Sequence, residues 1–342
     1  MWNAGHQVGF STWPTKGNKM PANIDSIAYT GEVPWHKSGT RLDNPMTAEQ
    51  AIEAGGIGWN VVKEPIYLDG ERQIQVKDRF VIRREDRLDA LDGGQLGVVG
   101  RDYVPLQNKD AFSFLNPVVV GGRALYHTVG ALNGGKQIWL LAKLPGVIKV
   151  VGEDITEKFL LLSNSHDGSS AVRILFTPIR VVCQNTLNLA LRATSGLSIK
   201  HYSDVQQKVQ ESYRLLGIVK EAYDRAEITM KAMAKVSMTG DRLKQYFEAV
   251  QPIPSVDEEE RLKVQQRHHR WEELFTAGDG NSLSGVRGTV WAAYNGITQW
   301  VDRESFSKRM KEPLKSIWFG GGRLLKERAF SQAERLLSVS LN

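Results

Sequence analysis

Cysteine is almost absent from this chain, and long apolar runs are absent altogether. Cys183 is the single cysteine among 342 residues, which excludes an internal disulfide and a zinc site built on cysteine. No apolar stretch reaches the roughly 18–20 residues that a membrane-spanning helix needs. The beginning of the chain lacks the charged and then apolar pattern of a secretory signal. These absences predict a cytoplasmic protein without membrane contact.

Charges of the two signs are nearly balanced, with a small positive excess. The chain contains 44 Lys and Arg and 38 Asp and Glu, so the formal net charge is +6. An apolar content of 41% with 24% charged residues is typical of a soluble globular protein. A positive excess of this size permits binding to a polyanion such as nucleic acid, but it does not require such a partner.

Hydrophobic periodicity divides the chain into three parts. Residues 1–22 have no period and are interpreted as an N-terminal arm. Residues 23–203 alternate with the period of β-strands and contain short helices, for which Thr47 and Asn108 are expected to be caps. Residues 204–342 have the period of helices. The predicted fold class is therefore α+β, with a mixed, mostly antiparallel sheet and short helices in the N-terminal half and a helical C-terminal half.

One long helix is expected between residues 205 and 233. Apolar or small residues recur there at alternating intervals of four and three, which is a heptad seam. Its members are Val205, Val209, Ser212, Leu216, Val219, Tyr223, Ala226, Met230 and Met233. Such a seam suits packing against another long helix or a second copy of the chain, and we expect a homo-oligomer joined through it. Further on, the Gly/Ser/Asn-rich stretch 277–289 predicts an exposed, mobile loop.

A row of polar residues follows the sequence Thr177-Pro178, which is a helix-start signature. We predict a helix over residues 178–193, with Cys183 as a structural cysteine on its buried face. An Arg/Gln/Asn row on the opposite face can bind phosphates and base edges. The alternative is an ordinary solvated face or a polar network between helix and sheet. The predicted nucleic-acid-binding residues here are Arg173, Arg180, Gln184, Asn185, Asn188, Arg192, Lys200 and His201.

The turn His166-Asp167-Gly168-Ser169-Ser170 admits two interpretations. One is a His–Asp pair at a catalytic or metal site; the other is a hairpin turn whose geometry Asp-Gly supplies. Neighbouring residues at a strand end point in opposite directions, and no spacing such as HExxH adds further ligands. The hairpin is the preferred interpretation, and no catalytic residue, metal or cofactor is predicted.

A second candidate phosphate contact is Trp318-Phe319-Gly320-Gly321-Gly322, which precedes a basic helix. Glycines at a helix start expose backbone N–H groups to an anion, and Arg323, Lys326 and Arg328 follow them. The motif matches neither a nucleotide P-loop nor GxGxxG, which argues against an ATP or NAD site. A simple turn between helices is the alternative. Near the other end, Trp35 and His36 can either stack on a base or pin the N-terminus to the sheet.

Four motifs match one known family in its order: PWHxxGT (34–40), RDYVPLQN (101–108), the block from SHDGSS to QNTLNLAL, and WFGGGRLLKERA. From about residue 24 to residue 337 the chain resembles the phage/plasmid-like protein family, an uncharacterised bacterial and phage domain of unknown function. The resemblance implies a phage, plasmid or other mobile-element gene whose product works in the bacterial cytoplasm, and it favours a role in DNA transactions. It assigns no catalytic residue.

These patterns together predict a non-enzymatic DNA-binding protein of a mobile element. It is expected to bind or anneal single-stranded DNA or to assist recombination, with the two basic segments holding phosphates. One alternative is a metal-dependent nucleic-acid-processing enzyme centred on His166 and Asp167. Another is a phage protein that acts on host protein partners without DNA contact.

Overall fold

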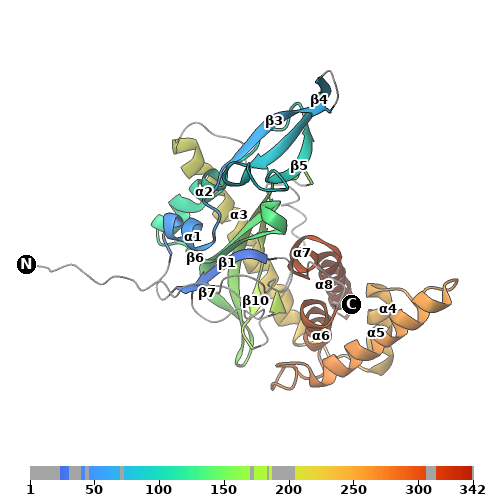
Figure 1. Cartoon of the computed structure of the whole chain (residues 1–342). Helices are drawn as coiled ribbons and strands as arrows, with labels where there is room; N and C mark the ends of the chain where they lie inside the picture. The colour runs from blue at the N-terminus through green and yellow to red at the C-terminus, as the bar shows by residue number, and fades with distance from the viewer. Residues whose placement is uncertain are drawn as a thin grey trace, which may run out of the picture.

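The computed structural model describes residues 24–30, 40–42, 46–69, 73–169, 173–182, 185–186, 205–305 and 313–340. The predicted fold class is confirmed: mostly antiparallel sheet with short helices comes first, and helices follow (Figure 1). The expected N-terminal arm, residues 1–22, lies outside the described residues. So does the expected domain boundary between residues 203 and 204.

A large sheet forms the centre of the first half. Its strands follow the order β11-β10-β8-β7-β6-β1-β2, and β9 also pairs with β8. Neighbours are antiparallel except β1 and β2. The run IWLLA (138–142) in β7 is buried on both faces, as a central strand requires. The strands are β1 (Ile24–Thr30), β2 (Thr40–Leu42), β6 (Leu125–Leu132), β7 (Gln137–Val151), β8 (Asp154–Ser165), β9 (Arg173–Phe176), β10 (Ile179–Arg180) and β11 (Asn185–Thr186).

A second, three-stranded antiparallel sheet projects from this body at the top of Figure 1. It consists of β3 (Val61–Leu68), β4 (Ile74–Arg84) and β5 (Gln95–Gly100). At Gly97, strand β5 of this sheet packs against the turn that follows β8, and only glycine fits at this position. A Cβ at Gly97 would lie 2.5 Å from the Asp167 Cα, which is too close for any side chain.

Eight α-helices are found in the described residues. Thr47 caps the first of them as predicted: its hydroxyl accepts the Gln50 N–H at 3.3 Å, and the Gln50 side chain accepts the Thr47 N–H at 3.0 Å. None of the described helices combines the length and the apolar character needed to cross a membrane. The helices are α1 (Ala48–Ala54), α2 (Asn108–Val120), α3 (Val205–Met233), α4 (Gly240–Val250), α5 (Glu258–Ala277), α6 (Val290–Arg303), α7 (Pro313–Phe319) and α8 (Gly321–Ser340).

The long helix α3 is confirmed, and the C-terminal part of its heptad seam packs inside the molecule. Val219, Tyr223, Met230 and Met233 are each at most 3% exposed. The Tyr223 hydroxyl donates to the Phe159 carbonyl oxygen and accepts the Phe159 N–H, both at 2.7 Å. In this part α3 packs against other helices of the same chain, α2 and α8 among them, as well as against β7 of the sheet. Oligomerisation through the rest of the seam stays a prediction.

One apolar core passes through both halves. It extends from Ala28 in β1 to Leu337 in α8 and includes Tyr223 of α3, which contacts the sheet. On the opposite face of β7, Trp139 packs edge-on against Trp318 of α7 with 4.8 Å between ring centroids. The helical half is thus packed directly on the sheet from two sides.

The helix predicted for residues 178–193 is wrong at its start. Residues 179–180 and 185–186 form the short strands β10 and β11, an antiparallel pair on the edge of β8. The Thr177 N–H donates to the Phe159 carbonyl at 2.9 Å, so the backbone is already extended where the helix was to begin. Local capping preferences are worth about 1 kcal/mol, and pairing with a sheet edge outweighs them here.

Arg180, predicted to face outward, is completely buried. Its Nε and Nη2 donate to the two carboxylate oxygens of Asp154, at 2.7 and 3.0 Å. Trp291 Nε1 donates to the same carboxylate at 2.6 Å, so α6 is attached to it as well. A phosphate cannot reach this guanidinium, and we withdraw Arg180 as a nucleic-acid contact.

The stretch 277–289, expected to be an exposed loop, supplies the remaining hydrogen-bond acceptors for the Arg180 guanidinium. The carbonyl oxygens of Asp279 and Gly280 accept hydrogen bonds from its guanidinium, each at 3.0 Å. Asn281 in this stretch is buried, and its amide nitrogen donates to the carbonyl oxygens of Leu274 and Ala292. Gly280, whose φ is 72°, permits this close approach of the backbone to a buried cation, since a Cβ on it would lie 2.9 Å from Arg180 Nη2.

Arg180→Ala should destabilise the protein by about 3–5 kcal/mol, because it leaves the Asp154 carboxylate buried without its counter-charge. Chemical denaturation measures the change in the free energy of unfolding. Arg261→Ala is the control, since Arg261 pairs with Glu258 at the surface and is expected to leave the unfolding midpoint nearly unchanged. Equal, small effects of both substitutions would show that Arg180 is solvated.

Candidate functional site

The predicted basic residues separate into those that are paired inside the protein and those that are not. Lys326 is fully buried, and its Nζ donates to Asp302 Oδ1 and to Thr186 Oγ1, both at 2.7 Å. Burial lowers the pKa of Lys326, while the Asp302 carboxylate raises it. Lys326 is therefore corrected from a phosphate contact to a structural tie between α8 and β11. Arg323 forms an ion pair with Glu327 one turn along α8.

Most other members of the predicted row receive no structural test. Arg173 lies in β9 and Asn185 in β11, where only their backbones are described. The remaining predicted residues lie outside the described residues: Trp35, His36, Cys183, Gln184, Asn188, Arg192, Lys200 and His201.

The turn after β8 is a hairpin, as preferred from the sequence. β8 pairs with β9, and Gly168 has a φ of 75°, which favours glycine. The side chains of His166 and Asp167 part at this turn. Asp167 accepts the hydroxyl of Ser165 and the Ser169 N–H, the latter at 2.8 Å, whereas His166 turns into the core. These contacts form no His–Asp dyad.

Asn108, expected to cap α2, is instead the partner of His166. Its amide nitrogen donates to the carbonyl oxygens of Ile57 and Trp59, so its oxygen faces His166 Nε2 at 2.8 Å. His166 consequently carries its proton on Nε2, and its Nδ1 has no hydrogen-bond partner among the described residues. Burial is the main cause that lowers the pKa of His166 from 6.5 to about 4. The histidine is a neutral core residue.

The described ranges contain no group of three or more His, Cys, Asp or Glu side chains that is placed to hold a metal ion.

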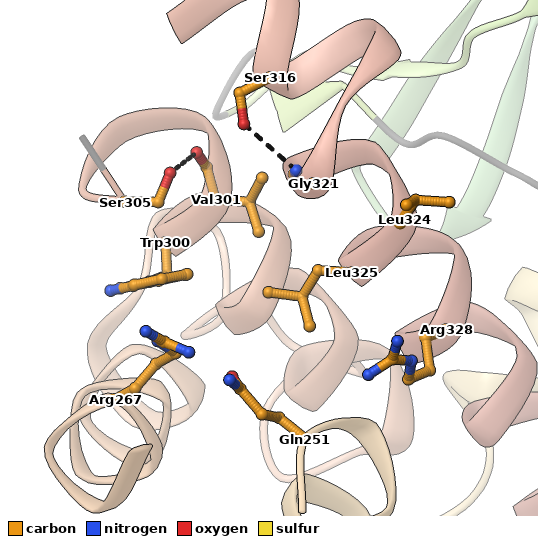
Figure 2. A pocket seen from close by; sticks show the side chains of 11 residues that line it. Gln251, Arg267, Trp300, Val301, Ser305, Ser316, Gly321, Leu324, Leu325 and Arg328 are labelled. Atoms are coloured by element: carbon orange, nitrogen blue, oxygen red, sulfur yellow. Dashed lines mark hydrogen bonds between the residues drawn. The ribbon is translucent and has the colours of Figure 1, made fainter. Parts of the chain in front are cut away.

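A pocket opens in the helical half, where α5, α6, α7 and α8 meet (Figure 2). Its volume is about 350 Å³, at the lower end of the range for small-molecule sites. Among the described residues that line it, two are arginines and none is acidic. The lining residues are Gln251, Arg267, Trp300, Val301, Ser305, Ser316, Gly321, Gly322, Leu324, Leu325 and Arg328.

Arg267 of α5 presents a half-buried guanidinium to this pocket. Its closest described partner is the Trp300 ring, whose centroid lies 5.0 Å from the guanidinium carbon. In the part of the chain that the structure describes, no carboxylate forms an ion pair with Arg267. Partial burial lowers the pKa of Arg267, because the surrounding protein solvates its charge less well than water does, and the negative charge of Glu260 opposes this shift only in part. A bound anion would offset this cost.

Arg328 reaches the pocket from α8, opposite Arg267. One of its N–H groups donates to the Val250 carbonyl at 3.1 Å, which orients the guanidinium and leaves other donors for a ligand. Figure 2 shows Arg267 and Arg328 on either side of Gln251, at the end of the pocket away from Ser316. The Gln251 amide oxygen has no hydrogen-bond partner among the described residues.

The glycine turn predicted from the sequence forms the other end of the pocket. α7 ends at Phe319, α8 begins at Gly321, and the Gly322 N–H donates to Ser316 Oγ at 3.3 Å. Gly322 is tightly packed, since a Cβ there would lie 3.0 Å from the Ser316 carbonyl oxygen and from a Val301 methyl group. A Cβ at Gly321 would meet no atom within 4 Å.

The prediction of a phosphate site near the glycine turn thus named Arg328 and the glycines but missed Arg267, Trp300 and Gln251. These three residues lie on different elements and have no motif in common. They become a site only because α5 packs on α6, a contact braced by Arg270 and Glu304 at 2.6 Å.

The fold and the pocket together define an α+β protein with an arginine-lined pocket in its helical half, whose described lining residues include no acid. The chain belongs to the family described as "Domain of unknown function (DUF932)", whose model matches residues 95–318. The match includes the pocket residues from Gln251 to Ser316, and α8 follows it. Neither a curated protein nor a solved structure matches the chain. Membership of an uncharacterised domain family agrees with the resemblance found in the sequence.

In the His166→Gln variant, the free energy of unfolding should decrease less on acidification than in the unsubstituted protein. The pKa of His166 is about 4 in the folded protein and 6.5 when exposed, so its contribution is complete above pH 6.5 and is lost as the pH falls toward 4. The difference amounts to roughly 3 kcal/mol. We expect denaturation at several pH values to show about one proton fewer taken up on unfolding by the variant.

His269→Gln is the matched control, because His269 is an exposed side chain on α5. It should retain the pH dependence of the unsubstituted protein. If His166→Gln retained it too, His166 would be solvated and free to titrate at its ordinary pKa.

Proposed function

We propose that this protein is a non-enzymatic nucleic-acid-binding protein of a phage or other mobile element, with single-stranded DNA as its partner. The pocket between α5 and α8 is the proposed phosphate contact. The observation that carries this proposal is the pair Arg267 and Arg328, which line one pocket and form no ion pair in the described part of the chain.

Two guanidinium groups around an acid-free pocket favour an anionic ligand. A partly desolvated cation is costly by itself, and a charge-assisted hydrogen bond to a phosphate contributes about 1.5–3 kcal/mol. Each such contact corresponds to a factor of roughly ten or more in affinity. The net charge of +6 supports the same partner at long range, because it attracts a polyanion. The proposed mobile-element origin is supported by the four sequence motifs.

The alternative of a metal-dependent enzyme is less favoured, because His166 and Asp167, its proposed catalytic pair, form hydrogen bonds with different partners. Action on a host protein without DNA contact remains the competing function, and binding measurements separate it from the proposal.

Titration of fluorescent single- and double-stranded oligonucleotides at several salt concentrations tests the proposal. We expect binding at low salt whose affinity falls as salt rises, with a larger affinity for single strands. Arg267→Gln with Arg328→Gln should weaken binding by about a hundredfold, since two contacts of roughly tenfold each are lost, and reduce the salt slope by about 0.7, the value for one phosphate that is no longer neutralised on a single strand.

Arg261→Gln with Arg287→Gln is the control of equal charge change, because neither residue lines the pocket. It should lower affinity only slightly. No binding at low salt, or equal losses in both double variants, would refute the pocket as the phosphate contact. Arg267→Lys with Arg328→Lys should recover most of the salt slope, since the charges are kept.

A further inference from the structure

The pocket has two chemically different ends. Arg267, Arg328 and Gln251 form a polar, cationic end, whereas Val301 and Leu325 lie between this end and the glycine turn as an apolar wall (Figure 2). Leu324 is an apolar side chain that is nevertheless 52% exposed. A ligand that fits both ends is itself amphiphilic, with an anionic group and a flat or compact apolar group. A bare phosphodiester backbone would leave the apolar wall in contact with water.

Gly321 is an exposed residue at the apolar end of the pocket. It lines the pocket, and a Cβ built on it meets no protein atom within 4 Å, whereas one on neighbouring Gly322 would collide. A side chain at Gly321 would therefore occupy space that no other residue uses. Gly321 is the first residue of α8 and its backbone is not in the left-handed region, so the backbone conformation does not require glycine here.

We infer that the pocket accepts one unpaired nucleotide, with its base against the apolar wall beside Gly321 and its phosphate between Arg267 and Arg328. This inference rests on the proposed function and states how single strands are selected. A base in a duplex is stacked and paired, so it cannot enter, whereas an unpaired base is free to do so at little cost. The Gln251 amide supplies a donor and an acceptor for polar groups of the nucleotide.

A peptide C-terminus is the other amphiphilic anion of this size. A carboxylate and a phosphodiester each carry one negative charge and two strongly accepting oxygens, so the two guanidinium groups alone do not distinguish them. The net charge of +6 attracts a polyanion at long range, which favours a strand of nucleotides over a single peptide carboxylate.

Gly321→Val fills the apolar end and tests the inference. Its affinity for a single-stranded oligonucleotide should fall about tenfold, while thermal unfolding is unchanged or slightly raised. Gly217→Val is the matched control, because Gly217 lies in α3, outside the pocket, and a Cβ there also meets no atom within 4 Å. Gly321→Ala, which favours helix, gives a smaller loss and keeps the test decisive should the valine variant unfold.

Oligonucleotides whose bases are replaced by abasic residues separate the inference from the proposed function. The unsubstituted protein should bind them about tenfold more weakly than the native strand, and Gly321→Val should weaken them no further. Equal, salt-dependent binding of native and abasic strands would overturn base insertion and leave phosphate binding standing. Absence of binding to every oligonucleotide at low salt would overturn both. Both would also be overturned if a short peptide with a free C-terminal carboxylate displaced the bound oligonucleotide and a nucleoside monophosphate did not.

Discussion

The buried ion pair between Arg180 and Asp154 holds the sheet and the helical half of this protein together. A buried guanidinium is tolerated only when its charge and all its N–H groups are matched, because desolvation costs several kcal/mol. Here the Asp154 carboxylate takes two N–H groups, and the backbone before α6 takes others. Since Asp154 also accepts Trp291 Nε1, breaking this pair would loosen β8, β10 and α6 together.

A second buried network extends this attachment to the pocket. Lys326 of α8 and Asp302 of α6 both form hydrogen bonds with Thr186 of β11. These bonds attach both helices to the strand that pairs with β10, which carries Arg180. Val301 directly precedes Asp302 in α6, Arg328 lies two residues after Lys326 in α8, and both line the pocket. The buried charges thus fix the backbone from which the pocket side chains project. The proposed ligand would therefore meet a preformed pocket, and less binding energy would be spent on ordering its side chains.

Local patterns predicted those elements whose determinants lie within a few residues of one another. The Thr47 cap, the Asp-Gly hairpin and the α3 seam all depend on such spacings. Arg180 could not be predicted in this way, because its carboxylate lies 26 residues before it and its carbonyl partners about 100 residues after it. Asn108 fails for the same reason: its oxygen meets His166, 58 residues away, rather than a helix end.

The same principle decides which positive charges are available for function. Arg180, Lys326 and Arg323 each have a carboxylate partner inside the fold, although the sequence marks them as strongly as any other basic residue. Arg267 and Arg328 differ from them only in what surrounds them: a tryptophan ring and a backbone carbonyl. Neither neighbour cancels a charge. In the described part of the chain, tertiary packing rather than residue type decides which basic side chains have an ion-pair partner, and the proposed phosphate contacts Arg267 and Arg328 form no ion pair there.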